Sequence, residues 1–271
     1  MFESLFRSWD IVKKSFGVLM SEKRLLIFPF LSMLVMLVLL ASFIVPVFVL
    51  GDNVLFIPLL FVFYFASYFV VIFFNSALVH AASEKLDGKD VSLSGSISFS
   101  LSRIVNIAGW AFVSATVGII LSMLRSASNK NSGIGGLVTR IVISLIGAAW
   151  SFATFLVVPV LVFENVGPIS ALKRSVSLLK STWSEQMWGN FSISGAFFLL
   201  YLPAIGIGIL LAALQEFTLL LLLLPALILY VGVLFILQGA LEGIFMTEIY
   251  KYATTGKAAV FGDVLQQGKI S

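Results

Sequence analysis

Five ionisable side chains that lie next to long apolar segments could do chemistry in this sequence. They are His80, Glu84, Glu164, Glu242 and Glu248. His80 and Glu84 are four residues apart, so they share one face if a helix continues through both. One functional interpretation is a polar vestibule on which these side chains converge. The alternative is that each acid pairs with a nearby basic residue or meets water at headgroup level, which is the usual role of charges at membrane ends.

A second set of residues could recognise anionic lipid. It comprises Lys13, Lys14, Lys173, Arg174 and Lys180. A basic side chain near an anionic membrane surface contributes about 1 kcal/mol of attraction. These charges would also anchor and orient the chain without recognising any particular lipid, and that alternative stays open.

No motif of known catalytic mechanism accompanies these residues. The sequence has no P-loop, no dinucleotide fingerprint, no nucleophile elbow and no H-E-x-x-H motif. With no Cys and a single His, disulfides, thiolate sites and His-rich zinc sites are excluded. We therefore predict a protein that is not an enzyme, with no catalytic residues, cofactor or metal. The net charge of +4 needs a membrane explanation before a nucleic-acid one, so no nucleic acid is predicted as a partner.

The elements that must position these residues are membrane helices. Hydrophobic residues make up 60% of the 271 residues and charged residues only 11%, which is typical of a chain dissolved in lipid. Six long uncharged runs each supply the ~20 residues that a helix needs to cross the hydrocarbon layer. The predicted spans are 25–50, 54–79, 104–124, 138–163, 191–213 and 218–241.

The basic residues predict the orientation of these spans. Fourteen of the 17 Lys and Arg residues lie in the N-terminal segment, in the connections after the second and fourth spans, and in the C-terminal tail. The other three are Arg125, Lys130 and Arg140. By the positive-inside rule both termini are cytoplasmic. The N-terminal segment contains three acids and lacks the pattern of a cleaved signal peptide.

An internal repeat lies outside the spans. Residues 11–21, IVKKSFGVLMS, align without a gap to residues 171–181, ALKRSVSLLKS. Both segments have apolar residues at steps of three and four, which predicts amphipathic helices in the cytoplasmic interface. At the corresponding place before the third span, residues 92–103 alternate Ser with mostly apolar residues, a pattern that fits a strand or a helix. We predict a helix, because a lone strand has no visible partner.

The predicted fold is therefore an all-α polytopic membrane bundle. Its six transmembrane helices form three hairpin repeats, each preceded by an interfacial amphipathic helix. Residues 1–271 form a single integral membrane domain, with an amphipathic cytoplasmic segment at 1–24, the six-span bundle at 25–250 and a cytoplasmic tail at 251–271. Kinks are expected at four prolines well inside the spans, namely Pro46, Pro159, Pro203 and Pro225.

Three stretches resemble a known family. They are SLFRSWDIVKKSFGVL near the N-terminus, PVLVFENVGPISALKRSVSLLK in the centre and EIYKYATTGK towards the C-terminus. Together they are similar to a prokaryotic family of six-helix integral membrane proteins of unknown function. More distantly, the chain resembles the membrane region fused to some glycerophosphodiester phosphodiesterases, whose catalytic barrel is absent here. The resemblance implies the fold and a prokaryotic inner membrane, and it carries over no active-site residue.

The sequence thus favours a non-enzymatic membrane protein that interacts with lipid, or organises membrane components, through a basic cytoplasmic face. Its expected partners are anionic membrane lipids. The alternative is an oligomeric channel or passive transporter for a small solute or ion, in which a pore is lined by Ser, Asn and backbone groups at the Pro and Gly positions. Charged residues are absent from the interiors of the predicted spans, which argues against ion-coupled transport but not against a pore.

Overall fold

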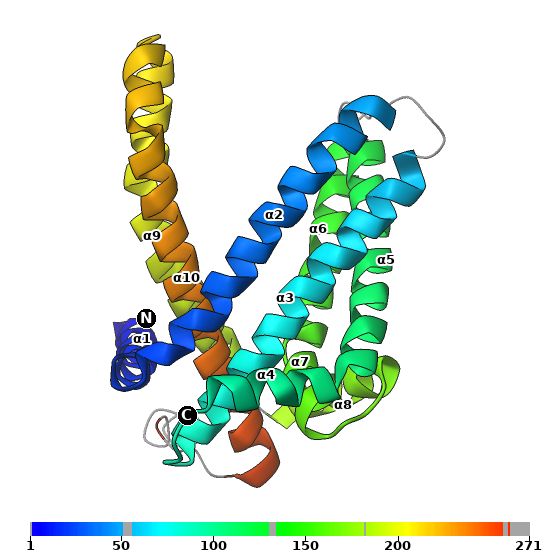
Figure 1. Ribbon diagram of the computed structural model, residues 1–271, viewed down its shortest axis with the longest axis vertical. Helices are drawn as coiled ribbons and strands as arrows, with labels where there is room; N and C mark the ends of the chain where they lie inside the picture. Colours follow the sequence, from blue (N-terminus) through cyan, green and yellow to red (C-terminus); the bar gives the residue numbers. More distant parts are fainter. Residues whose placement is uncertain (1, 51–55, 130–133, 182, 257–259, 261–271) are drawn as a thin grey trace. The chain divides into compact units, whose positions relative to one another are not determined.

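The computed structural model describes residues 2–50, 56–129, 134–181, 183–256 and 260. All regular secondary structure in these residues is helical, which confirms the predicted all-α class (Figure 1). The elements are α1 (Phe2–Ser21), the 3₁₀ helix η1 (Lys23–Leu26), α2 (Ile27–Leu50), α3 (Phe56–Leu86), α4 (Leu93–Ser102), α5 (Ile104–Asn129), α6 (Ile134–Thr154), α7 (Val157–Phe163), α8 (Pro168–Ser181), α9 (Trp183–Ala213) and α10 (Phe217–Thr255).

Six segments in the described residues are long and apolar enough to cross a membrane. They are Lys23–Val49, Phe56–Leu86, Ile104–Ser128, Gly135–Phe163, Ile193–Ala213 and Phe217–Thr255. These match the six predicted spans, but two helices run well past the predicted ends. Helix α3 continues to Leu86 and α10 to Thr255. His80 and Glu84 therefore do lie on one continuous helix, as do Glu242 and Glu248.

The fourth predicted span, 138–163, consists of two helices, and the break lies close to Pro159, where a kink was expected. Helix α6 ends at Thr154 and α7 begins at Val157. Pro159 is the physical reason, because it has no N–H to donate to the carbonyl of Phe155, four residues earlier. The prolines of three other helices, Pro46, Pro203 and Pro225, are instead accommodated inside continuous helices.

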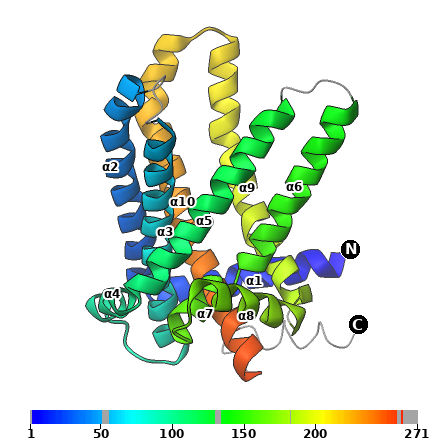
Figure 2. The same cartoon turned by 90° about the vertical axis from the view of Figure 1, so that its right-hand side faces the viewer.

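The chain divides into two compact units. The first consists of Met1–Phe30, Ala81–Val91 and Thr182–Ser271, and within it α1 packs against both helices of the α9–α10 hairpin (Figure 1). The second consists of Leu31–His80 and Ser92–Ser181, and within it α8 packs against α5, α6 and α7 (Figure 2). Our prediction placed each interfacial helix before its hairpin in the chain. That order along the chain is confirmed, and in space α8 packs on the hairpin that precedes it while α1 packs on the last hairpin.

The ambiguous segment 92–103 forms the helix α4, as predicted. Its first turn is capped by the Ser92 hydroxyl, which accepts a hydrogen bond from the Gly95 N–H at 3.1 Å. Ser96 and Ser100 lie on the buried face of this helix, whereas Ser94 and Ser98 are exposed, so burial follows helical spacing and not strand alternation. Gly88 follows α3 and Gly256 follows α10, and both adopt left-handed φ values, 71° and 69°, that favour glycine.

Candidate functional site

The two repeated helices, α1 and α8, bury the same face. Each presents one buried residue every four positions to the helices on which it packs. On α1 these residues are Ile11, Ser15 and Leu19, and on α8 they are Ala171, Ser175 and Leu179. All six are at most 5% exposed, so the aligned positions of the repeat are equivalent in three dimensions as well as in sequence.

The repeated helices also expose flanks of similar composition, which share two aligned positions, Lys13 with Lys173 and Phe16 with Val176. On α1, exposed Lys13 is followed at steps of three and four by Phe16 and Met20, whose side chains are 45% and 41% exposed. We call these three residues the α1 flank. The α8 flank consists of Ile169, Lys173 and Val176, of which Ile169 is 55% and Val176 38% exposed. Each flank thus combines a lysine with two apolar side chains on one side of its helix.

The other predicted lipid contacts differ from these lysines. Arg174 donates a hydrogen bond from Nε to Glu164 Oε1 at 3.1 Å, so this pair fulfils the expectation that an acid at a span end pairs with a basic residue. Lys14 is half-buried on α1. The side chain of Lys180 lies outside the described residues. Lys13 and Lys173 are therefore the predicted contacts that the structure places on equivalent exposed flanks.

Ser175 has a function that the sequence did not predict. Its hydroxyl donates to the carbonyl of Ala153 at 2.7 Å and accepts from the N–H of Leu156 at 3.2 Å. These backbone groups belong to the break between α6 and α7, where the helix cannot satisfy them. Ser175 therefore holds α8 against the break between α6 and α7 by two hydrogen bonds.

Of the predicted vestibule residues, His80 and Glu164 lie in the second unit. The His80 ring stacks on Phe99 with 4.1 Å between centroids, and its Nδ1 lies 3.2 Å from Ser96 Oγ on α4. The guanidinium carbon of Arg103 also lies over the Phe99 ring, 5.3 Å from its centroid. His80 is thus the packing contact between the end of α3 and α4.

Glu84, Glu242 and Glu248 lie in the first unit, and Glu84 is half-buried near the end of α3. Glu248 is fully buried and accepts a hydrogen bond from the Val260 N–H at 2.7 Å, which ties the chain after α10 back to the helix. Glu242 accepts a hydrogen bond from Gln238 at 2.8 Å. Among the described residues, no three His, Cys, Asp or Glu side chains come close enough to hold a metal ion.

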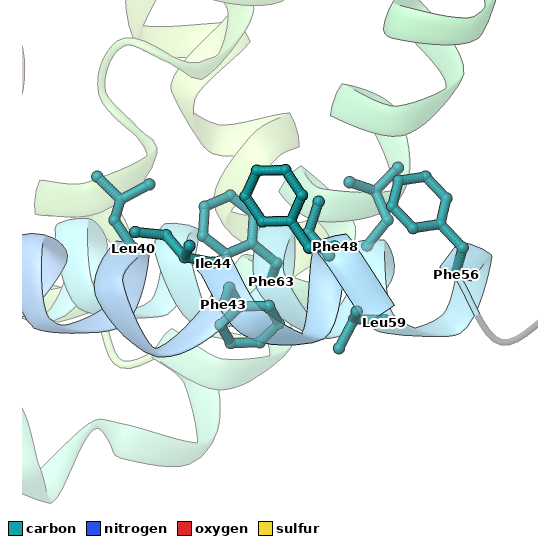
Figure 3. A pocket seen from close by; sticks show the side chains of 9 residues that line it. Leu40, Phe43, Ile44, Phe48, Phe56, Leu59 and Phe63 are labelled. Atoms are coloured by element: carbon teal, nitrogen blue, oxygen red, sulfur yellow. The ribbon is translucent and has the colours of Figure 1, made fainter. Parts of the chain in front are cut away.

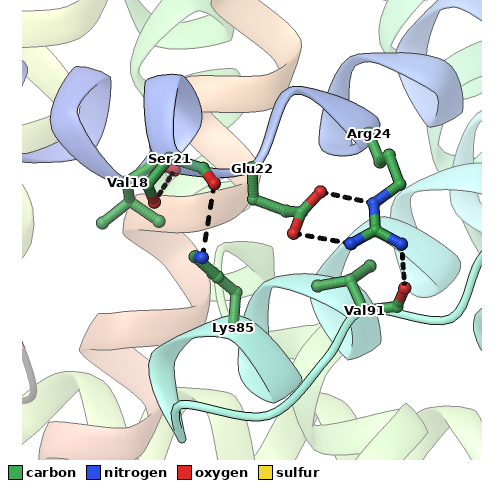
Figure 4. Close-up of polar contacts among 6 residues, drawn as sticks. All are labelled: Val18, Ser21, Glu22, Arg24, Lys85 and Val91. Carbon is green, nitrogen blue, oxygen red and sulfur yellow. Dashed lines mark hydrogen bonds and ion pairs between the residues drawn. The ribbon is translucent and has the colours of Figure 1, made fainter.

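A polar clasp in the first unit was missed by the sequence analysis. Glu22 and Arg24 form two hydrogen bonds of 2.6 and 3.0 Å, and Arg24 Nη1 donates to the carbonyl of Val91 at 2.9 Å (Figure 4). Lys85 Nζ donates to the carbonyl of Ser21 at 3.3 Å. The side-chain hydrogen bonds from Arg24 hold the pKa of Glu22 below its ordinary value of 4.5, against an opposing effect of burial.

The end of α10 is fastened in a similar way. Lys251 Nζ makes an ion pair with Asp87 at 2.6 Å and donates to the carbonyl of Ser83 at 3.1 Å. Together with the clasp, this contact joins the ends of α1, α3 and α10 within the first unit. These contacts join residues that are 64 to 168 positions apart in the sequence, so sequence spacing gives no signal for them.

An apolar groove lies between α2 and α3 in the second unit. Figure 3 shows Phe43, Ile44 and Phe48 of α2 facing Phe56, Leu59 and Phe63 of α3 across it. The groove has a volume of about 340 Å³ and its lining is almost wholly apolar. Because both walls are membrane-spanning helices, this groove is part of the surface that meets lipid tails.

The six long apolar helices and the two amphipathic helices define an α-helical protein that crosses the membrane several times. Residues 54–260, three quarters of the chain, match a family of unknown function, DUF6159. The chain belongs to this family. The matched region begins after α2, so it does not include the N-terminal stretch on which the predicted resemblance partly rested. No curated protein and no solved structure matches the chain.

Proposed function

We propose that this protein is a non-enzymatic integral membrane protein that binds anionic lipids through the flanks of α1 and α8, with both helices in the cytoplasmic interface. Its termini are cytoplasmic in this proposal, which the excess of Lys and Arg on that side supports. Holding lipid at these helices is also how it would organise components of a prokaryotic inner membrane.

The observation that carries the proposal is the equivalence of the two flanks. Phe16 and Val176 occupy aligned positions, each three residues after a lysine, and both are exposed although each helix buries another face completely. An amphipathic helix in the interface immerses such side chains at the boundary of headgroups and acyl chains. The neighbouring lysine then meets the phosphate layer, while its apolar stem lies along the hydrocarbon.

Lipid retention measured by native mass spectrometry tests this proposal. The protein would be incorporated into nanodiscs of mixed anionic and zwitterionic phospholipid and released with its bound lipids. We expect Lys13→Gln and Lys173→Gln each to weaken binding of the anionic lipid about fivefold, the factor that corresponds to about 1 kcal/mol per charge. Lys89→Gln is the matched control, because Lys89 is an exposed lysine of a loop with no apolar flank.

Two outcomes would overturn the proposal. One is binding that is indifferent to headgroup charge in the unmodified protein. The other is an equal loss of anionic lipid in Lys89→Gln, Lys13→Gln and Lys173→Gln, since this would mean that net charge alone attracts lipid.

A further inference from the structure

The groove between α2 and α3 is lined only by hydrocarbon side chains. Four of them are phenylalanines, Phe43 and Phe48 on α2 and Phe56 and Phe63 on α3, and the others are Leu, Ile and Val (Figure 3). Water does not fill apolar cavities of this kind, because it finds no hydrogen-bond partners there. The occupant of the groove is therefore itself apolar, either a lipid chain or part of another membrane helix.

A ring contact limits the size of the groove. The ring centroids of Phe43 on α2 and Phe63 on α3 are 5.0 Å apart, so the two helices touch through these rings. The space beside the rings has a volume of about 340 Å³, and its lining on α2 runs from Leu40 to Phe48, a length of about 12 Å. A helix of ~10 Å diameter occupies roughly 900 Å³ over this length. The groove can therefore take up a single hydrocarbon chain, but not a helix.

The groove lies within one leaflet of the membrane. Leu40 is ten residues before the end of α2 at Leu50, or about 15 Å along the helix axis. Phe63 is seven residues after the start of α3 at Phe56, or about 10 Å. Half of the ~30 Å hydrocarbon layer is about 15 Å. The groove thus runs along the helices through the leaflet in which α2 ends and α3 begins, which is also the direction of a lipid chain in that leaflet.

The two walls of the groove differ in exposure. Phe48 and Ile44 on α2 are 86% and 55% exposed, whereas Phe63 on α3 is half-buried. In lipid the attraction between apolar groups comes from close packing and not from the hydrophobic effect. A chain seated between the walls gains such contacts on two sides, while a chain on a convex helix face has them on one. Aromatic side chains with two torsions also lose little entropy when they are ordered by the chain.

We propose that the groove between α2 and α3 binds one acyl chain of a phospholipid in the leaflet in which α2 ends and α3 begins. A hydrocarbon lining recognises the chain and not the headgroup, so binding at this site is indifferent to headgroup charge. The site therefore differs from the basic flanks of α1 and α8 in its residues and in its chemistry. It does not depend on the binding of anionic lipid proposed for those flanks.

Photolabelling of the unmodified protein in proteoliposomes tests the proposal. A phosphatidylcholine with a diazirine on its acyl chain loses N₂ on illumination, and the resulting carbene inserts into a nearby bond that peptide mass spectrometry locates. We expect more label at Leu40 and Ile44 than at Val45 and Val49, which lie on α2 outside the groove and are 67% and 73% exposed. Label distributed in proportion to exposure would overturn the proposal, because lipid chains would then show no preference for the groove.

A variant with a filled groove provides a second test. Ile44→Trp places an indole in the groove, and Val45→Trp is the matched control, one residue further along α2 and outside the lining. Native mass spectrometry from nanodiscs of zwitterionic lipid counts the retained phospholipids. We expect Ile44→Trp to lose one of them, and Val45→Trp and Lys13→Gln to keep it.

Two results of this count would contradict the proposal. Equal lipid counts in Ile44→Trp and Val45→Trp would show that the groove holds no chain. A dimer that Ile44→Trp alone abolishes would show that a second copy of the protein covers the groove. Because the lipid is zwitterionic, neither result bears on the binding of anionic lipid by the flanks of α1 and α8.

Discussion

Helices α1 and α8 share a sequence pattern, a buried face and an exposed flank, yet their buried serines differ. Ser175 bonds to two backbone groups of the break between α6 and α7. Ser15 is equally buried, but within the described part of the chain its hydroxyl has no hydrogen-bond partner. The surfaces beneath them explain this difference, because α8 lies on a span broken at Pro159 whereas α1 packs on two continuous helices. The repeat therefore specifies which face is buried, and the docking surface decides what each buried residue does.

The largest losses of stability are expected when the leucines at aligned positions of α1 and α8 are replaced by Ala. Leu19 is 0% and Leu179 5% exposed, so Leu→Ala leaves a cavity at either position and costs about 2–5 kcal/mol of stability. Thermal unfolding in detergent micelles would measure both losses. A large loss at one position only would break the equivalence of the two helices. Phe16→Ala and Val176→Ala are the controls and should change the midpoint little, because both side chains are exposed.

The next largest loss of stability is expected for Ser175→Ala and not for Ser15→Ala. Ser175→Ala leaves the Leu156 N–H and the Ala153 carbonyl without this partner, which costs about 1–3 kcal/mol when the groups are buried. Ser15→Ala removes a hydroxyl that has no partner among the described residues, so it should leave stability unchanged or raise it slightly. Equal losses in the two variants would contradict our explanation of the comparison.

A smaller change in stability is expected when the ion pairs next to the two helices, Glu22 with Arg24 and Glu164 with Arg174, are removed. Glu22 accepts two hydrogen bonds from Arg24, while Glu164 accepts one from Arg174. Because the pKa of Glu22 is lowered in the folded state, its contribution to stability is present above pH 4.5 and is lost as the pH falls through the folded-state value. Glu22→Gln should flatten this acid limb of the stability curve. An unchanged acid limb in Glu22→Gln would show that the clasp does not stabilise the fold.

The smallest effect is expected for Glu164→Gln. Glu164 is 27% exposed whereas Glu22 is 11% exposed, and the distance from Arg174 Nε to Glu164 Oε1 is 3.1 Å against 2.6 Å in the other pair, so solvent screens this attraction more. We expect the midpoint of unfolding to move less than in Glu22→Gln. A larger shift than in Glu22→Gln would mean that Glu164 has a function beyond this pair, as the vestibule hypothesis requires.

The sequence predicts what depends on local periodicity. The six spans follow from long uncharged runs and the buried face of the repeat from the spacing of apolar residues, while the helix at 93–102 also required that a lone strand would have no partner. The break at residues 155–156 was not predictable in the same way. Kinks were expected at four prolines well inside the spans, and whether a helix breaks at such a proline depends on which neighbours satisfy the freed backbone groups. At Pro159 that neighbour includes Ser175, which is 16 residues further along the chain.

The candidate sites show the same division. Lys13 and Lys173 were predictable from the repeat, since their positions on α1 and α8 follow from helical spacing. The contact of Arg24 with Val91 joins residues 67 positions apart, and the hydrogen bond from Tyr201 to Gln238 joins residues 37 apart. Such contacts depend on how helices pack, and no spacing rule encodes them. The sequence likewise gave no signal that α10 continues past Glu242 to Thr255.

The most direct test of the central claim is the environment of the two flanks in a bilayer. Since the chain has no Cys, single spin labels can be attached at Phe16→Cys and Val176→Cys, with Gly17→Cys and Ser177→Cys as exposed controls one residue along each helix. We predict that the flank labels collide mainly with oxygen dissolved in lipid, and the control labels mainly with a water-soluble nickel chelate. Equal access of the chelate to all four labels would contradict the claim that α1 and α8 lie in the membrane interface.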